Sequence, residues 1–398
     1  MADADEFPSS DVPVESLDPG DLEARIESGA PVTILDVRAT SEYEKWHIGG
    51  ENVRIVNVPY FDFLEGVTDD LLAQVPEGDP VVAVCAKGGA SEYVAGLLLE
   101  EGIDAVNLAD GMNGWARVYV AGEVTAAPGP ATVLQYRRPS SGCLAYLVHD
   151  GGEGAVIDPL RAFVDSYVAD AERLGVTLRY AIDTHVHADH VSGVRELAAV
   201  SGATPVVPAE AVPRGVDYDV DYDTVADGET LAIGEATIEA HHTPGHTSGM
   251  TSYLVDDAVL LTGDGLFVES VARPDLEAGD EGAPDAAARL YDSLHERVLT
   301  LPDDTVVAPG HYSDAATPAE DGTYTARLGD LADAMGALSM TREAFVEFIL
   351  ADMPPRPSNH EAIIATNLGR RETDDEEAFE LELGPNNCAA TQTAMTGD

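Results

Sequence analysis

Short apolar runs separated by patterns of helical period dominate the first third of the chain. Residues 32–37, 81–84 and 105–108 are largely apolar and have the length of buried strands. Between the last two runs, Tyr93, Leu97 and Leu98 share one helical face, and Gly102 suits the end of that helix. Strands that alternate with helices predict an α/β domain with a mainly parallel sheet.

In the rest of the chain, a group of strand patterns followed by a helical pattern occurs twice. Strand patterns cover residues 131–136, 143–148, 154–157 and 178–182, and a helical pattern covers residues 163–174. Further strand patterns lie at residues 237–240, 250–255 and 258–261, and a helical pattern covers residues 341–350. Two β-rich halves, each followed by helices, predict sheets sandwiched between helical layers.

A linker is indicated by two prolines that flank a glycine between Thr125 and Ala131. The chain has no internal repeat of solenoid length. We therefore expect a first domain over residues 17–122, a linker over 123–130, a second domain over 131–371 and an acidic, mobile tail over 372–398.

The charge balance excludes several partners. The formal net charge is −52, from 73 acidic and 21 basic residues that are spread along the chain. Nucleic acids and anionic membrane surfaces need a basic face, so neither is an expected partner. The lysines are Lys45 and Lys87 alone. A very acidic, lysine-poor globular chain is typical of salt-accumulating halophiles, where screening suppresses self-repulsion; an unusually acidic protein of a non-halophile is the alternative.

The cysteines indicate a reducing compartment. Cys85, Cys143 and Cys388 are too few and too scattered for a disulfide framework. The first residues lack the basic and apolar regions of a signal peptide, and no segment has the apolar length of a membrane span. We expect a cytoplasmic protein. Cys143 lies in a predicted strand and is expected in the core, whereas Cys388 lies in the tail with no motif around it.

A histidine-rich loop follows the strand pattern that ends at Ile182. It holds four potential metal ligands, and three more residues each follow a later strand pattern, where ligand sites of α/β folds commonly lie. Imidazole and carboxylate together suit zinc or iron. The predicted metal site comprises His185, His187, Asp189, His190, His246, Asp264 and His311.

The order HxHxDH, then His, Asp and His resembles the metallo-β-lactamase superfamily over about residues 131–369. The resemblance implies an αββα sandwich with metal at the sheet edges, and two chemistries stay open. A hydrolase of the glyoxalase II type would cleave a thioester with two zinc ions. It would bind the first metal with His185, His187 and His246 and the second with Asp189, His190 and His311, and Asp264 would bridge them.

The second chemistry is that of the persulfide dioxygenases, which residues 262–276 and 289–302 resemble. That resemblance implies one Fe(II) held by His185, His246 and Asp264, with open positions for a persulfide and O2. The products would be sulfite and the free thiol, and the other four residues would lie nearby without binding iron. Arg273 is a candidate for steering an anionic persulfide; a surface ion pair is its alternative.

Cys85 follows a strand pattern and opens a loop that contains Gly88 and Gly89. Inward-pointing amides and a helix starting near Ser91 would stabilise a thiolate or a persulfide there. Residues 35–38, 42–50, 85–91 and 108–115 resemble a rhodanese domain, which implies a persulfide carried on Cys85. Many active rhodaneses have arginine where Ala86 stands, and Lys87 is the candidate replacement cation.

The sequence thus predicts a rhodanese-like domain followed by a metallo-β-lactamase fold. The preferred function is an Fe(II)-dependent persulfide dioxygenase that uses a low-molecular-weight persulfide and O2, coupled to sulfur transfer at Cys85. Family resemblance makes a homodimer the expected assembly. The alternatives are a two-zinc thioester hydrolase with an accessory rhodanese domain and a non-catalytic sulfur relay or sensor.

Overall fold

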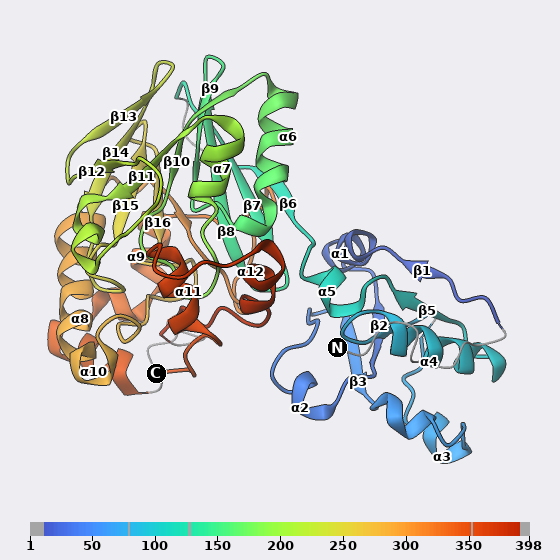
Figure 1. Ribbon diagram of the computed structural model, residues 1–398. Helices are drawn as coiled ribbons and strands as arrows, with labels where there is room; N and C mark the ends of the chain where they lie inside the picture. Colours follow the sequence, from blue (N-terminus) through green and yellow to red (C-terminus); the bar gives the residue numbers. More distant parts are fainter. Residues whose placement is uncertain (1–11, 79, 126–128, 352, 391–398) are drawn as a thin grey trace. The chain divides into compact units, whose positions relative to one another are not determined.

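The computed structural model describes residues 12–78, 80–125, 129–351 and 353–390 (Figure 1). The chain divides into two compact units, one formed mainly by residues up to Tyr119 and the other by most of the remainder. Part of the expected linker, residues 126–128, lies outside the described residues. Among the described residues, no helix combines the length and the apolar character that crossing a membrane requires.

The first unit contains a parallel five-stranded sheet in the order β1-β5-β4-β2-β3, which confirms the expected α/β class. Its strands are β1 (Ser16–Leu17), β2 (Val32–Asp36), β3 (Val53–Asn57), β4 (Val81–Val84) and β5 (Ala105–Leu108). Its helical elements are α1 (Pro19–Glu27), α2 (Thr40–Tyr43), η2 (Tyr60–Phe63), α3 (Asp69–Leu72), α4 (Gly89–Glu100) and α5 (Gly111–Trp115). The central strand β4 is buried throughout, as its continuous apolar run predicts.

The second unit contains two sheets. The seven-stranded sheet runs in the order β12 (Asp223–Val225), β11 (Thr204–Pro208), β10 (Thr177–Ile182), β9 (Glu153–Ile157), β8 (Cys143–Asp150), β7 (Thr132–Arg138) and β6 (Val120–Glu123). The six-stranded sheet runs β13 (Thr230–Ile233), β14 (Ala236–His242), β15 (Thr251–Val255), β16 (Val259–Gly263), β17 (Val306–Pro309) and β18 (Ala326–Arg327). Strand β6 falls within the expected first domain, but it pairs antiparallel with β7 in the second unit.

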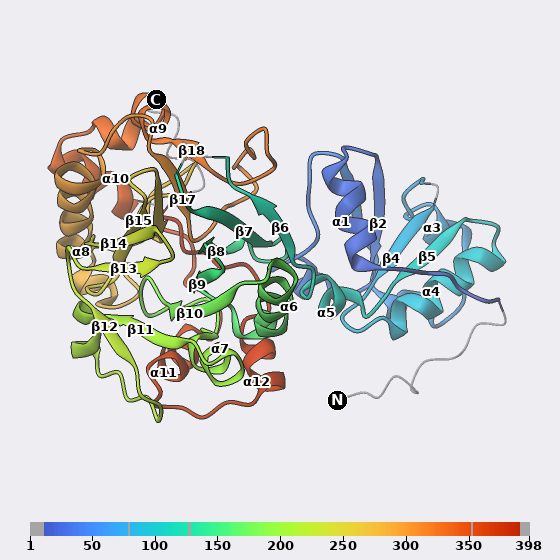
Figure 2. The same cartoon turned by 90° about the horizontal axis from the view of Figure 1, so that it is seen from above.

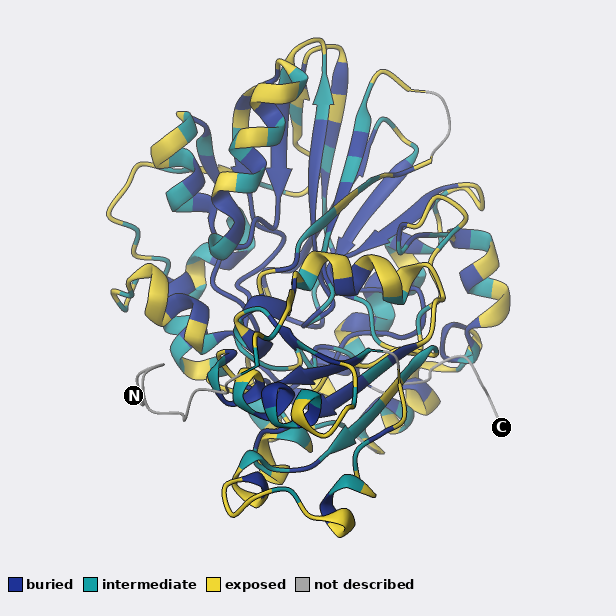
Figure 3. Cartoon of the chain, turned by 90° about the vertical axis from the view of Figure 1, so that its right-hand side faces the viewer, coloured by how far each residue is buried: buried dark blue, intermediate teal, exposed yellow. Residues whose placement is uncertain are grey.

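The two sheets pack face to face. A buried apolar cluster joins Tyr146 and Ile182 of the first sheet to Ile238, Tyr253 and Leu261 of the second. Figure 2 shows α6 and α7 on one side of the sheets and α8 and α10 on the other, and Figure 3 shows the buried strands between exposed helical faces. The unit is therefore an αββα sandwich, as expected.

The helical elements of the second unit include α6 (Val164–Leu174), α7 (Val194–Ser201), α8 (Gly279–Ser293), the π-helical η5 (Leu294–Val298), α9 (Leu328–Ala334), α10 (Arg342–Ala351), α11 (His360–Asn367) and α12 (Asp375–Leu381). Short 3-10 turns are η3 (Arg161–Phe163), η4 (Ala209–Arg214) and η6 (Gly336–Ser339).

The structure differs from the expected mobile tail over residues 372–390. Asp374 caps α12 by accepting a hydrogen bond from the amide of Glu377, and Phe379 on that helix is buried. Further on, Ala389 forms an antiparallel bridge with Ala272, and Cys388 is fully buried. This acidic stretch is packed because its few apolar residues fall where they contact the sandwich. Residues 391–398 lie outside the described part of the chain.

Candidate metal centre

All seven predicted ligand residues meet at one end of the sandwich. Each follows a strand: the loop of residues 183–190 follows β10, His246 follows β14, Asp264 follows β16 and His311 follows β17. All seven side chains are buried. The strand ends are close because Gly310 lacks a side chain; a Cβ there would lie 2.6 Å from Oδ1 of Asp264.

Three ligand atoms in this cluster converge without a hydrogen-bond partner. They are Nε2 of His185, Nε2 of His246 and Oδ2 of Asp264. The carboxylate oxygen lies 3.7 Å from the first nitrogen and 3.6 Å from the second. Buried polar atoms are rarely left unpaired, so three that face one another indicate a missing common partner. Two imidazoles and a carboxylate form the donor set that non-haem Fe(II) favours.

The opposite edge of each imidazole is anchored. Nδ1 of His246 lies 2.9 Å from the carbonyl oxygen of Arg273, which can only accept, so Nδ1 carries the proton. Nδ1 of His185 lies 2.8 Å from Oγ1 of Thr184, whose hydroxyl lies 2.9 Å from Oδ2 of Asp158. The hydroxyl donates to that carboxylate and accepts from His185. Both Nε2 atoms are therefore left with a lone pair facing Asp264.

The electrostatics of these three groups suit metal binding. Burial lowers the pKa of His185 well below its ordinary value, and burial likewise lowers the pKa of His246. Burial alone would raise the pKa of Asp264, but His311, which lies 2.6 Å from Oδ1 of Asp264, outweighs burial and holds this pKa below its usual range. The set thus presents two neutral imidazoles and one carboxylate, the forms that bind a metal ion.

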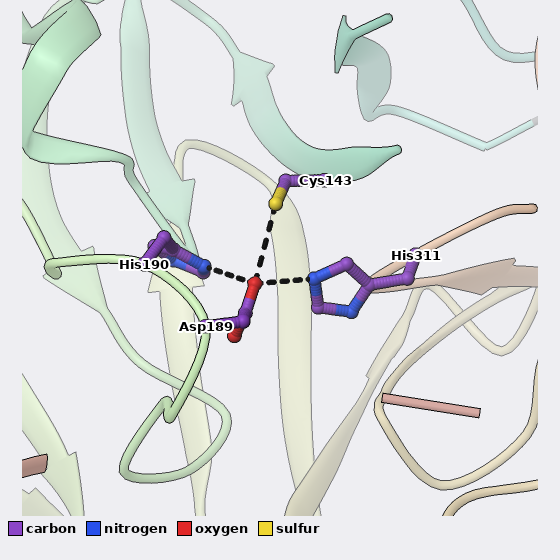
Figure 4. A group of neighbouring side chains, drawn as sticks. All are labelled: Cys143, Asp189, His190 and His311. Atoms are coloured by element: carbon purple, nitrogen blue, oxygen red, sulfur yellow. Dashed lines mark hydrogen bonds and ion pairs between the residues drawn. The ribbon is translucent and has the colours of Figure 1, made fainter. Parts of the chain in front are cut away.

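A second group surrounds one oxygen of Asp189 (Figure 4). Oδ2 of Asp189 lies 3.2 Å from Sγ of Cys143, 3.0 Å from Nδ1 of His190 and 2.8 Å from Nε2 of His311. The other nitrogen of His311 lies 2.6 Å from Oδ1 of Asp264. Both ring nitrogens of His311 therefore pair with carboxylates. Burial alone would lower the pKa of His311, but Asp264 and Asp189 outweigh burial and raise this pKa well above its ordinary value. Asp189 likewise outweighs burial at His190 and raises its pKa to about 9.

Two residues that the sequence did not single out hold the histidine-rich loop. Asp158, directly after β9, accepts from the backbone amide of Thr184 at 2.6 Å and pairs with Nε2 of His187 at 3.1 Å. Nδ2 of Asn367 donates to the backbone carbonyls of His187 and His190. Like the candidate ligand residues, Asp158 comes directly after a strand, and this position in the sequence could have identified it. Asn367 stands alone at the end of α11 and gives no sequence signal.

The other two cysteines also adjoin the site. Cys143 is buried at the start of β8, where the sequence placed it, but its thiol contacts Asp189. Cys388 was assigned no role, yet its sulfur lies within 4.8 Å of ligand atoms of Asp189, Asp264 and His311. No local motif marks Cys388, because long-range backbone pairing brings it there.

Arg273 differs from its expected role in steering substrate. Its side chain is 1 % exposed. Its guanidinium pairs with Asp275 through Nε and Nη2 and donates from Nη1 to the carbonyls of Pro355 and Asn387. A guanidinium saturated by protein acceptors has no face left for a persulfide. Its backbone carbonyl, however, orients His246.

Cys85 lies between β4 and α4 in the first unit, as the sequence predicts. Its sulfur accepts a hydrogen bond from the amide of Gly88 at 3.1 Å, and Oγ of Ser91 lies 3.2 Å from the sulfur and 2.7 Å from Oδ1 of Asn107. The loop is tight because Gly111 has φ +56° and a Cβ there would lie 2.1 Å from the carbonyl oxygen of Cys85. Lys87 is exposed, and the hydrogen-bond neighbours found for the thiol are Gly88 and Ser91.

Comparison with known proteins identifies both units. Residues 139–311 match the family model of the metallo-beta-lactamase superfamily, and residues 18–118 match that of the rhodanese-like domain. The mitochondrial persulfide dioxygenase ETHE1 of Bos taurus is 26 % identical over 250 residues, which cover 61 % of this chain and 90 % of the relative. The hydroxyacylglutathione hydrolase of Methylococcus capsulatus is 35 % identical over 215 residues, 52 % of this chain and 78 % of that protein.

A solved structure agrees with these matches. The crystal structure of ETHE1 from Myxococcus xanthus superposes with a TM-score of 0.51 and 29 % identity. It covers 60 % of this chain and 98 % of its own. The similarity thus spans more than half of this chain and nearly the whole of the other protein.

Proposed function

This chain belongs to the metallo-β-lactamase superfamily, and on that premise we propose that it is an Fe(II)-dependent persulfide dioxygenase coupled to sulfur transfer at Cys85. It would convert a low-molecular-weight persulfide, O2 and water to sulfite and the free thiol. The similarity to persulfide dioxygenases supports this activity.

The observation that carries the proposal is the convergence of the three unpartnered atoms of His185, His246 and Asp264. These residues would hold the iron. When bound there, ferrous iron would supply open positions for the persulfide sulfur and for O2 and would exchange electrons between them. The donor set would leave such positions because three protein atoms make up this group, fewer than the coordination positions of iron.

The surrounding residues orient the ligands and keep water away. Thr184 and Asp158 fix the ring of His185, and the carbonyl of Arg273 fixes that of His246. His311 holds Oδ1 of Asp264 and leaves Oδ2 facing inward. Phe267 is buried and packs edge to face against His311, which adds an apolar wall.

The first unit would transfer sulfane sulfur through Cys85. The amide of Gly88 donates to its sulfur, and the hydroxyl of Ser91 lies 3.2 Å away, so both would stabilise a persulfide anion there once the hydroxyl turned from Asn107. Lys87 is exposed, so it is available to an incoming anionic donor.

A two-metal thioester hydrolase is the second candidate. Nδ1 of His187, Oδ1 of Asp189 and Nε2 of His190 also lack a partner, and the similarity to hydroxyacylglutathione hydrolases favours a second metal. Against it, Asp189 and His311 already satisfy each other. A second ion would have to displace that pair.

Metal analysis of anaerobically purified protein tests the choice. We expect one iron per chain and O2 uptake with sulfite release when glutathione persulfide is added. Two tightly bound zinc ions and turnover of an acylthiol would instead establish the hydrolase.

A further inference from the structure

Asn107 places a buried amide beside the loop that carries Cys85. It lies in β5, pairs with Ala83 of β4 and is 5 % exposed. Its backbone amide donates to the carbonyl of Glu15 at 2.8 Å, so the pairing of the strand does not depend on the side chain. The other residues of β5 are apolar, and asparagine is disfavoured in strands, so this side chain calls for another explanation.

The hydroxyl of Ser91 has more acceptors within reach than its single hydrogen can serve. Its Oγ lies 2.7 Å from Oδ1 of Asn107, 3.0 Å from the carbonyl oxygen of Gly88 and 3.2 Å from Sγ of Cys85. The amide oxygen is the nearest acceptor, so the hydroxyl donates to Asn107. Oγ is then free to accept from the thiol of Cys85.

The charge on Cys85 changes this arrangement. A thiol can donate to Oγ of Ser91, but a thiolate has no hydrogen and can only accept. A hydrogen bond to a charged acceptor is stronger than one to a neutral amide, so the hydroxyl would turn from Asn107 to the sulfur. Forming the thiolate therefore costs the bond between Ser91 and Asn107.

We propose that Asn107 is a positioning residue that lowers the reactivity of Cys85 by competing with its sulfur for the hydroxyl hydrogen of Ser91. The inference rests on the proposed sulfur transfer at Cys85 and specifies how that site is regulated. All three residues are buried, which keeps the competition among these side chains.

The competition acts on the first step of sulfur transfer. The thiolate of Cys85 attacks the terminal sulfur of a carrier persulfide RS–SH, the carrier's S–S bond breaks, and a new S–S bond forms to Cys85. The carrier leaves as RSH with the proton that Cys85 gave up. Because Asn107 favours the thiol, it slows this step and protects the resting thiol from other electrophiles.

Alkylation of the full-length protein by iodoacetamide at neutral pH tests the inference without any sulfur donor. The tryptic peptide that carries Cys85 ends at Lys87 and holds no other cysteine, so its mass reports the rate in every variant. Asn107→Val removes the competing acceptor and should speed alkylation by about three- to tenfold. Ser91→Ala removes the donor to the thiolate and should slow alkylation by about the same factor. An unchanged rate in Asn107→Val would overturn the inference.

Two controls separate this role from looser packing. In the Ser91→Ala background, Asn107→Val should leave the alkylation rate unchanged within about twofold, because Asn107 acts through the hydroxyl. Asn107→Asp keeps an acceptor of the same size and should not speed alkylation. Equal acceleration by Asn107→Val with and without the hydroxyl, or by both substitutions of Asn107, would identify packing as the cause and overturn the inference.

Sulfur transfer is measured separately, as thiocyanate formed from cyanide with glutathione persulfide as the donor. We expect kcat/KM for glutathione persulfide to rise in Asn107→Val by the same factor as the alkylation rate. A wild type and variants with the expected alkylation rates but no thiocyanate would refute the sulfur transfer and leave the role of Asn107 intact. Thiocyanate formation with equal alkylation rates in the wild type and Asn107→Val would refute the role of Asn107 alone.

Discussion

Nδ1 of His246 lies 2.9 Å from the backbone carbonyl of Arg273, whose guanidinium is clamped by Asp275. The arginine thus orients the ring of His246, a proposed metal ligand, through its main chain. Arg273→Met should cost about 3–5 kcal/mol of unfolding free energy, because it leaves a buried carboxylate short of a partner. Arg356 also pairs with Asp275, which places the expected loss at the lower end of that range.

The matched control is Arg342→Met. Arg342 pairs with Asp292 at the surface, where solvent screening leaves ion pairs with little effect on the free energy of unfolding. Urea unfolding of both variants, together with their iron affinity, measures the contrast. Equal losses in the two variants would contradict a special role for Arg273.

Thr184→Val should weaken metal binding more than it weakens the fold. Valine has nearly the shape of threonine but removes the hydroxyl that links His185 to Asp158. We expect a loss of about 10- to 100-fold in iron affinity, measured by competition with a chelator. Thr184→Ser keeps the hydroxyl and should stay near wild type; a loss of the same size in the serine variant would count against the hydrogen-bond argument.

Sulfur transfer at Cys85 and persulfide oxidation at the metal centre should be separable by single substitutions. Cys85→Ser should abolish sulfur transfer to cyanide yet keep O2 uptake with added glutathione persulfide, since each reaction has its own residues. Asp264→Ala should do the reverse. If Cys85→Ser also stopped O2 uptake, direct oxidation of an added persulfide would be excluded.

Glu269→Gln should stabilise the protein at neutral pH. Burial raises the pKa of Glu269, and its Oε2 has no partner while Oε1 accepts from the amide of Ser313 at 2.8 Å. The folded state therefore favours the protonated acid, so stability falls as pH rises above the ordinary carboxyl range. We expect a gain on the order of 1 kcal/mol at pH 7 that disappears below about pH 4.

Thermal unfolding at several pH values checks this prediction. Glutamine keeps the acceptor for Ser313 and carries no charge. Glu281→Gln, on an exposed residue of α8, should change stability little at any pH. A gain that does not vary with pH would point to packing as its cause.

Salt should stabilise the whole protein. A net charge of −52 creates self-repulsion that added ions screen. We expect the unfolding temperature to rise by roughly 10 °C or more between low and molar KCl, well beyond the effect of an equal osmolality of sucrose. A flat response to KCl would contradict the halophilic interpretation of the composition.

The sequence predicted the strands and the positions of the candidate ligand residues after them well, because both depend on local patterns. The runs at residues 81–84 and 105–108 became β4 and β5 with those bounds, and each predicted ligand lies just past a strand. Order along the chain was sufficient to place His246 and His311 in one cluster, since strands of one sheet end at common edges.

The role of Arg273 and the position of Cys388 could not be derived in this way. Arg273 looked like a substrate contact because its charge was visible in the sequence, whereas its partners Pro355 and Asn387 lie 82 and 114 positions away. Cys388 reaches the site through a backbone bond to Arg273, which leaves no side-chain pattern. Hydrogen bonds between residues so far apart in the sequence leave no local periodic pattern from which they could be predicted.

Gly310 limits what evolution can change at the candidate metal centre. A Cβ at this position would lie 2.6 Å from Oδ1 of Asp264 and 3.0 Å from the backbone carbonyl carbon of Gly263. A substitution would therefore disturb both the carboxylate and the backbone of the neighbouring strand end. Descendants of this gene should keep glycine here for as long as selection maintains this arrangement of strand ends.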